Sequence, residues 1–271
     1  MASANKPVDY FARHPVFRFE DFVAAHREGG ARSVQSSQAV LKQHVRAGNL
    51  LHLRRGLYAV VPRGQSPSTL PVDPYLLAGR MASDAVVAYH AALQFHGKAH
   101  SASRRFTYLT RARAKPFRFR GSEFVPVPVP APLRVLPDMG GGIIEKRRDG
   151  LPVRVTTLER TLVDVLAASR HGGGWEEIWR SLEAVEFFDL DAVTDYAVKL
   201  GSAVTVARVG FFLEQHREPL MVDEQHLQRL RGHAPRRPTY LDRRREPGKL
   251  VVRWNLVVPE RVLNRTWAEV A

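Results

Sequence analysis

Two aspartates have the spacing with the clearest potential for metal and phosphate chemistry. Asp189 and Asp191 form an Asp-x-Asp pair, and paired carboxylates of this kind hold Mg²⁺ and nucleotide phosphates in nucleotidyl transfer. In that chemistry the pair closely follows a Gly-Ser, but neither Gly-Ser of this sequence is followed at short range by Asp-x-Asp. The pair lies at the start of a predicted helix, where carboxylates cap backbone N–H groups. We therefore interpret it as a helix cap.

A nuclease site of the PD…ExK kind is the next candidate. Pro137-Asp138 is followed by Glu145 and Lys146, which are adjacent. On a strand, adjacent side chains point to opposite faces, so these two residues are not expected to share a metal site.

Two glycine runs and a group of histidines lack the spacing of a phosphate or metal site. The runs 140–142 and 172–174 lack the Gly-Lys-Ser/Thr of a phosphate-binding loop and are predicted to be turns. His90, His96 and His100 are close in sequence, but no carboxylate stands near them at metal-ligand spacing, so we expect structural roles. The sequence therefore predicts a protein that is not an enzyme and needs no cofactor and no metal.

The segment TTLERTLVDVLAAS is a predicted helix with a capping box from Thr156 to Glu159, and it contains a candidate for a partly buried ion pair. Arg160 and Asp164 are four residues apart and would meet on one helix face. Either they form an ion pair that fixes the position of the helix, or Arg160 belongs to a binding surface for a partner or a phosphate.

The charge of the chain points to a polyanion as partner. Its 271 residues have a formal net charge of +14, and the charge is segregated. Residues 1–66 have ten basic and four acidic residues, and residues 98–120 have eight basic and no acidic ones, whereas residues 171–228 have four basic and eleven acidic ones. A chain this basic has nucleic acid or an anionic surface as its default partner. No apolar run is long enough to span a membrane, and the absence of cysteine is consistent with a cytoplasmic location.

The N-terminal segment has the elements of a DNA-binding unit. A helix is predicted over Phe19–Glu28, and a second over 36–47 with Ser36 as its N-cap and Gly48 at its end. LLHLRRGLYAVVP, residues 50–62, follows as a hairpin. In the second helix, Ser37, Leu41, His44 and Val45 would face inward, and Gln35, Gln38, Lys42 and Arg46 would form a polar outer face.

Two helices followed by a hairpin are the order of a winged helix-turn-helix, in which the second helix enters the major groove. Arg54 and Arg55 would lie at the tip of the hairpin, or wing, where guanidinium groups bind phosphates or enter the minor groove. The predicted DNA-binding residues are Gln35, Ser36, Ser37, Gln38, Lys42, Gln43, Arg46, Arg54 and Arg55.

The rest of the chain predicts a larger domain. Residues 1–66 would form the DNA-binding domain, 67–74 a Pro- and Ser-rich linker, and 75–271 a second domain. In the second domain we expect helices over 74–81 and about 84–95, strands near 104–129, a hairpin with its turn at Asp149-Gly150, further helices, and a last strand in GKLVVRWNLVVPE. The fold class is therefore α+β: an N-terminal winged helix-turn-helix followed by a larger mixed α+β domain.

Arginines and aromatic residues alternate in the predicted strands of the second domain. This pattern marks either a nucleic-acid surface or an amphipathic strand whose outer face is solvated. The candidate nucleic-acid or partner surface consists of Arg104, Arg105, Arg111, Arg113, Arg118 and Arg160.

Several segments, taken in order, resemble the AbiEi antitoxins of type IV (abortive infection) toxin–antitoxin systems. They are LRRGLYAVVP, DPYLLAGRM…AYHAALQFHG, RVTTLERTLVDVLA, ARVGFFLEQ and KLVVRWNLVVPE, and they cover nearly the whole chain. The resemblance implies a bacterial, cytoplasmic protein that binds inverted repeats in operator DNA and represses its own operon. It also implies a C-terminal domain that counters a nucleotidyltransferase-like toxin, directly or indirectly.

Two alternatives stay open. One is a winged-helix regulator whose large domain senses a small ligand, and the other is a DNA-targeted nuclease or nucleotidyltransferase, against which the missing paired carboxylates argue.

Overall fold

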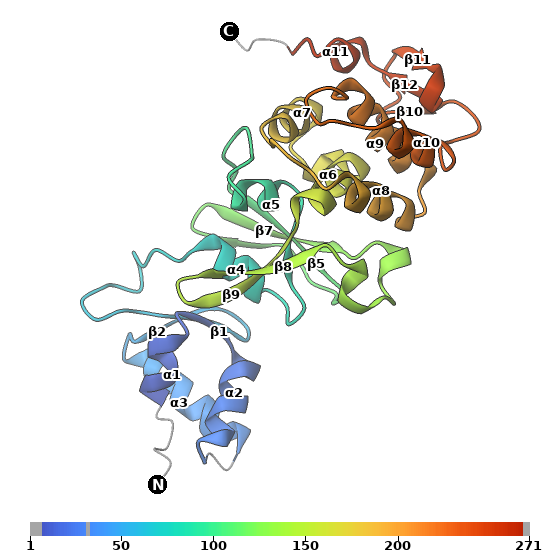
Figure 1. Cartoon of the computed structure of the whole chain (residues 1–271). Helices are drawn as coiled ribbons and strands as arrows, with labels where there is room; N and C mark the ends of the chain where they lie inside the picture. The colour runs from blue at the N-terminus through green and yellow to red at the C-terminus, as the bar shows by residue number, and fades with distance from the viewer. Residues whose placement is uncertain (1–6, 31–32, 268–271) are drawn as a thin grey trace.

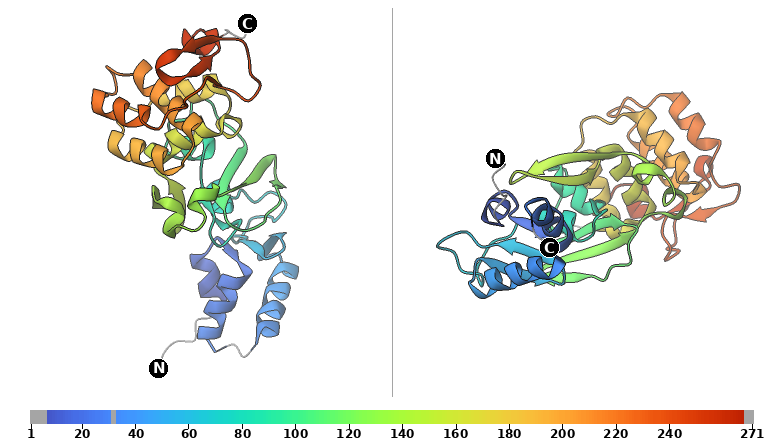
Figure 2. Two further views of the ribbon diagram at one scale, coloured as in Figure 1. Left: turned by 90° about the vertical axis from the view of Figure 1, so that its right-hand side faces the viewer. Right: turned by 90° about the horizontal axis from the view of Figure 1, so that it is seen from below.

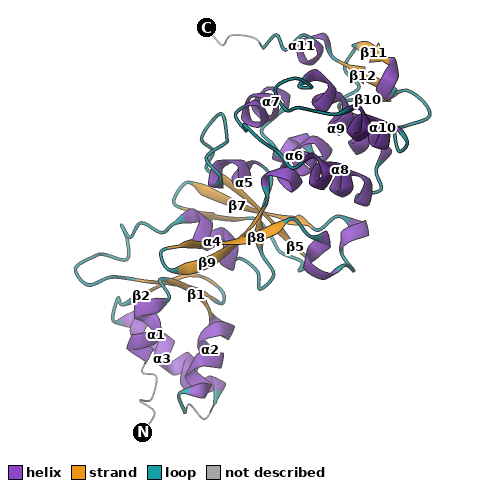
Figure 3. Cartoon of the chain, in the orientation of Figure 1, coloured by secondary structure: helices purple, strands orange, loops and turns teal. Residues whose placement is uncertain are grey.

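The computed structural model of the protein describes residues 7–30 and 33–267, and it shows three successive parts along an elongated molecule (Figure 1). The first part (7–61) combines helices with a small sheet, the second (74–156) is built on a six-stranded sheet, and the third (157–267) is mostly helical. Strands are concentrated in the middle of the molecule and helices at its two ends (Figure 3). The predicted α+β class is confirmed. Within the described residues, none of the helices has the length and apolar character that crossing a membrane requires.

The N-terminal part contains three helices and an antiparallel sheet with strand order β1-β3-β2. The helix predicted over Phe19–Glu28 is confirmed at both ends. The next helix begins at Val34 because Ser33 is its N-cap and accepts a hydrogen bond from the Ser36 N–H at 3.1 Å, so the predicted cap at Ser36 is wrong. The elements are α1 (Pro7–Arg13), β1 (Val16–Arg18), α2 (Phe19–Glu28), α3 (Val34–Arg46), β2 (Leu50–Arg54) and β3 (Leu57–Val60).

The central sheet has strand order β6-β7-β5-β4-β9-β8. The predicted hairpin is confirmed, since Asp149 and Gly150 both have positive φ in the turn between β8 and β9. The helix predicted from Asp84 is wrong in its first half, where Val86–Val87 form the inner strand β4. The elements are α4 (Pro74–Arg80), β4, α5 (His90–Phe95), β5 (Arg105–Thr110), β6 (Phe117–Phe119), β7 (Ser122–Pro128), β8 (Ile143–Arg148) and β9 (Leu151–Thr156).

Strand β4 replaces a helix because both faces of the sheet are covered. Val86 packs with the helices of the third part, and Val87 packs with α4 and the N-terminal sheet. A short apolar run that is buried on both sides suits an inner strand better than an amphipathic helix. Tyr89 then adopts a positive φ, and α5 starts only after it.

The third part packs six helices and a small sheet with strand order β10-β12-β11. Its first helix is capped by Thr157 rather than by the predicted Thr156, which ends β9. The predicted last strand is split, because Asn255 adopts a left-handed conformation after the buried Trp254. The elements are α6 (Leu158–Ala167), α7 (Trp175–Glu183), α8 (Leu190–Lys199), α9 (Ala203–Gln215), α10 (Glu224–Arg231), β10 (Thr239–Tyr240), β11 (Lys249–Val251), β12 (Leu256–Val258) and α11 (Glu260–Leu263).

The three parts share hydrophobic cores. One cluster joins α6 to α9 with one face of the central sheet, and a second joins the other face with α4 and the N-terminal sheet. The predicted linker contributes Leu70, which is 4% exposed, to the second cluster, and Asp73 caps α4. The N-terminal part is therefore packed against the central sheet. Figure 2 shows its helices extending away from that sheet.

Candidate nucleic-acid interface

The outer face of α3 is polar and basic. Gln35, Gln38, Lys42 and Arg46 are exposed at spacings of three, four and four residues, and Gln43 beside them is exposed as well. Leu41 on the opposite face is buried in the aromatic core of the N-terminal part. The helix sequence VQSSQAVLKQHVR contains no acidic residue. This face can donate hydrogen bonds to base edges and phosphates without opposing negative charge.

Two serines predicted to contact DNA instead make hydrogen bonds within the N-terminal part. Ser37 is fully buried, and its Oγ lies 2.9 Å from His26 Nδ1, which ties α3 to α2. The expectation that Ser37 reaches DNA is therefore wrong. Ser36 is half-buried, and its hydroxyl donates to the Ser33 carbonyl at 2.7 Å.

The hairpin separates the two arginines that the sequence places together. Arg55 is exposed in the turn. Arg54 is half-buried, its Nη2 donates to the Met81 carbonyl at 2.9 Å, and its guanidinium lies over the Phe117 ring. The pairing of β2 with β3 shifts between His52 and Arg54, and such irregularities re-aim side chains. The prediction that both arginines lie at the tip is therefore wrong for Arg54, which faces the central sheet.

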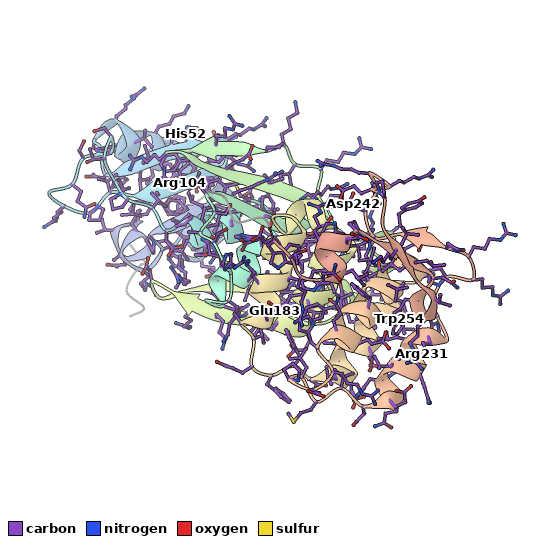
Figure 4. The ribbon with its side chains drawn as sticks, turned by 90° about the horizontal axis from the view of Figure 1, so that it is seen from above. His52, Arg104, Glu183, Arg231, Asp242 and Trp254 are labelled. Atoms are coloured by element: carbon purple, nitrogen blue, oxygen red, sulfur yellow. The ribbon has the colours of Figure 1, made fainter. Side chains whose placement is uncertain are left out.

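A basic groove of about 500 Å³ lies where β5, β6 and β7 meet. Arg105 and Arg118 lie 3.7 and 3.4 Å from Glu123, which offsets part of their charge. Arg104 is exposed at the rim, and Figure 4 shows it near the same end of the molecule as His52 of the hairpin. Sequence reasoning missed Arg120, which also lines this groove. The Arg120-Gly121 pair at the β6–β7 turn, where both residues have positive φ, was the available signal.

The aromatic residues that alternate with these arginines are not free to stack on bases. Phe106 and Tyr108 are buried, and Phe117 and Phe119 are half-buried beneath Arg54 and Arg120. This arrangement favours the second interpretation of the alternating pattern, in which it marks an amphipathic strand with a solvated basic face.

Two further arginines of the candidate surface differ in their surroundings. Arg111 is exposed, but its Nε and Nη2 donate to the carbonyls of Arg134 and Leu136 and hold that loop. Arg113 is exposed in the segment between β5 and β6.

Arg160 lies in the core. It is 1% exposed, its Nε lies 3.3 Å from Asp164 Oδ2, and its Nη1 donates to the carbonyls of Met139 and Gly141. Tyr196 donates its hydroxyl to Asp164 at 2.9 Å. Burial raises the pKa of the Asp164 carboxyl, against the opposing charge of Arg160. The interpretation as an ion pair that positions the helix is confirmed, and Arg160 as part of a surface is wrong.

The remaining candidates for chemistry have structural partners. Asp189 accepts the Ala192 N–H and caps α8, as predicted. His90 lies 2.9 Å from Glu177, and His96 lies 2.8 Å from the Thr156 carbonyl. In the part of the chain that the structure describes, no three His, Cys, Asp or Glu side chains are grouped as metal ligands.

Comparison with known proteins shows similarity to a solved structure but to no protein family. No protein-family model matches the sequence, and none of the curated proteins matches it. Among solved structures, the chain is similar to the RV2827C protein from Mycobacterium tuberculosis, with 19% identity and a TM-score of 0.58 over 96% of this chain and 92% of that one. The two proteins therefore share a fold over nearly their whole lengths.

Proposed function

We propose that this protein binds operator DNA through a winged helix at its N-terminus, represses its own operon, and acts as an antitoxin of the AbiEi type. The observation that supports the DNA-binding half most strongly is α3, a helix without acidic residues whose exposed face presents glutamine, lysine and arginine.

The order of elements around α3 supports the same proposal. A helix, a strand, two helices and a two-stranded hairpin follow one another, and β1 pairs with β3 at the side of the hairpin. This is the order of a winged helix-turn-helix, in which the last helix enters the major groove and the hairpin lies beside it. Arg55 in the turn is then the wing residue that meets the phosphate backbone.

The antitoxin half is supported by the resemblance in sequence, which continues through α4, α5, α6 and α9 to the last strands. In this proposal the central and C-terminal parts counter a nucleotidyltransferase-like toxin. A ligand-sensing regulator is the second candidate, and a basic cleft in the C-terminal part favours it.

The DNA-binding proposal is tested by gel shifts on the chain's own upstream DNA and on a scrambled duplex of equal length. We expect tighter binding to the upstream duplex and, because phosphate contacts release counterions, a steep loss of affinity between roughly 50 and 200 mM salt. Lys42→Ala with Arg46→Ala should weaken binding about tenfold or more.

The matched control removes one lysine and one arginine from another exposed surface. Lys146→Ala with Arg147→Ala on β8 changes the net charge equally and should leave specific binding almost unchanged. Equal binding to both duplexes, or equal losses in the two double variants, would show that charge alone drives the interaction and would contradict the proposal.

The antitoxin proposal is tested by co-expression with a neighbouring nucleotidyltransferase-like gene. We expect growth to be restored by the wild-type chain and also by the Lys42→Ala, Arg46→Ala variant, because the two activities lie in different parts. Growth arrest that persists with the wild-type chain would contradict this half and leave the DNA-binding half intact.

A further inference from the structure

A basic cleft lies in the C-terminal part, between the end of α6, the side of α9 and the segment 238–246. It consists of two adjoining cavities of about 400 and 710 Å³. Both cavities are lined by Ala167, Arg208, Asp242 and Arg243. Figure 4 shows Asp242 well apart from His52 and Arg104, so the cleft is separate from the candidate nucleic-acid interface.

Arg208 lines both cavities and is only 8% exposed. Its Nη1 donates to the carbonyls of Leu166 and Ala167, each at 3.0 Å, and its guanidinium lies over the Trp175 ring. Its Nε has no hydrogen-bond partner, and within the described residues no carboxylate comes within ion-pair distance of it. Burial lowers the pKa of Arg208 to about 10. The guanidinium is thus held in the cleft by two backbone carbonyls, and the negative charge of Asp242 acts on it without a direct ion-pair contact.

The two carboxylates in the cleft are already engaged. Asp242 accepts hydrogen bonds from Trp175 Nε1 and from the Arg244 N–H, each at 2.9 Å. Glu246 is paired with Arg261 at 2.6 Å. Asp242 and Glu246 offset only part of the charge of the arginines that line the two cavities, so the cleft keeps an excess of positive charge.

Besides Arg261, four further arginines line the first cavity, the second or both. Arg170, Arg243, Arg244 and Arg245 are all exposed. None of these four has an ion pair among the described residues. Because guanidinium groups bind phosphate oxygens bidentately, a cleft of this composition favours a phosphorylated ligand.

We propose that this cleft binds a nucleotide, with Arg208 and Arg243 holding its phosphates and Tyr240 stacking on its base. Tyr240 is 41% exposed and lines the second cavity, and its aromatic ring offers the kind of surface on which a base stacks. The cavities fall in the range of about 300–1,000 Å³ that encloses small ligands.

The charge around the cleft favours a small anion over a long nucleic acid. Residues 171–228, which form α7, α8, α9 and the start of α10, contain eleven acidic and four basic residues. A long polyanion that crossed these helices would meet this negative charge, whereas a nucleotide bound in the cleft would not, because none of the eleven acidic residues lines either cavity. The proposal is independent of DNA binding by α3.

The test is isothermal titration calorimetry on the full chain with ATP, GTP, pyrophosphate and adenosine. We expect ATP or GTP to bind, pyrophosphate to bind more weakly, and adenosine to give no heat. Arg243→Ala should weaken nucleotide binding about tenfold or more, because a charge-assisted contact is lost. Arg236→Ala, an exposed arginine nearby that does not line the cleft, is the matched control and should bind as the wild type does.

Two more variants separate the contribution of base stacking from that of phosphate binding. Tyr240→Ala should weaken nucleotide binding and leave pyrophosphate binding unchanged. Arg208→Gln should abolish binding of both, and if this variant fails to fold, Arg243→Ala and Tyr240→Ala decide the question.

Four outcomes would overturn the proposal. Two concern the cleft itself: no heat with any phosphorylated ligand, or equal affinity in Arg243→Ala and wild type. Two concern the kind of ligand: binding of adenosine alone, or binding of a 5′-phosphorylated oligonucleotide without binding of the mononucleotides. Gel shifts with Lys42→Ala, Arg46→Ala report on α3 only, so failure here and failure of the DNA-binding proposal are distinguishable.

Discussion

Arg160 shows how one buried charge organises its neighbourhood. Two nitrogens of the guanidinium are engaged, Nε by Asp164 on the same helix and Nη1 by carbonyls of the loop that precedes β8, while Nη2 is buried without a hydrogen-bond partner. Gly142 in that loop has a positive φ, and a Cβ there would lie 2.9 Å from Arg160 Cβ. Gly142 is therefore needed where the backbone passes closest to Arg160, and Gly140 packs in the same way against Leu133, which gives these glycines a structural role.

Arg160→Ala should lower the free energy of unfolding by about 3–5 kcal/mol, because it leaves a buried carboxylate without its partner. Urea denaturation measures the change. Arg180→Ala, which breaks another pair four residues apart with Glu176 but on the surface, should lose less than about 1 kcal/mol. Similar losses in the two variants would show that burial does not make the Arg160–Asp164 pair more important for stability than a surface pair.

His171 makes the stability of the protein depend on pH. Burial, together with the charges of Arg170 and Arg105, lowers the pKa of its ring from 6.5 to about 4. Between these values the unfolded chain binds a proton that the folded chain does not, so stability falls as the pH is lowered from about 6.5 to about 4. The full stability is therefore present above about pH 6.5, where His171 is neutral in both the folded and the unfolded chain.

His171→Phe should reduce this loss while keeping a ring packed against Tyr89. The measurement is the urea midpoint at neutral pH and near pH 5, for the variant and the wild type. The exposed His233→Gln is the control and should follow the wild type. An acid loss as large in His171→Phe as in the wild type would assign the effect to other groups.

At the scale of elements, α3 depends on a residue outside it. Ser33 Oγ accepts the Ser36 N–H, while Ser36 itself donates its hydroxyl to the Ser33 carbonyl. The cap fixes where the exposed face of α3 begins and therefore which side chains are presented.

Ser33→Ala should lower the free energy of unfolding by about 1 kcal/mol, the usual effect of losing an N-cap. Ser36→Ala keeps the capped backbone N–H and should lose less. Thermal unfolding followed by circular dichroism compares the two variants, and a larger loss in Ser36→Ala would reverse the assignment of the cap.

At the scale of the molecule, the N-terminal part is docked onto the central sheet through the same hairpin that forms the proposed wing. Arg54 reaches Met81 and Phe117, and Val16, Leu57 and Ala59 join the core beneath α4. The docking fixes the direction in which α3 and Arg55 face.

Substitution of these two adjacent arginines should therefore affect different properties, stability for Arg54 and DNA binding for Arg55. Arg54→Ala should lower the free energy of unfolding by about 1–3 kcal/mol, because its hydrogen bond joins two parts of the molecule. Arg55→Ala should change stability by less than about 0.5 kcal/mol but reduce the salt slope of DNA binding by about 1. Urea denaturation and gel shifts at several salt concentrations measure both quantities, and a reduced slope in Arg54→Ala alone would return Arg54 to the proposed DNA interface.

The sequence by itself determined the features that depend on near neighbours. The bounds of α2, the turn at Asp149-Gly150 and the polar face of α3 follow from hydrophobic periodicity and turn chemistry. The cap positions of α3 and α6 do not follow from the sequence, because several serines or threonines near each helix start can accept the same hydrogen bonds.

Only the tertiary structure decided which residues are buried and which side chains meet. Val86 and Val87 form a strand because distant segments cover both of their faces, and Arg54 turns inward because Met81 offers it a carbonyl. The cleft around Arg208 likewise assembles α6, α9 and the segment 238–246, which are far apart in the chain. Burial and ion pairing depend on residues that are distant in the sequence and come into contact only when the chain packs. A local pattern of residues therefore does not predict them.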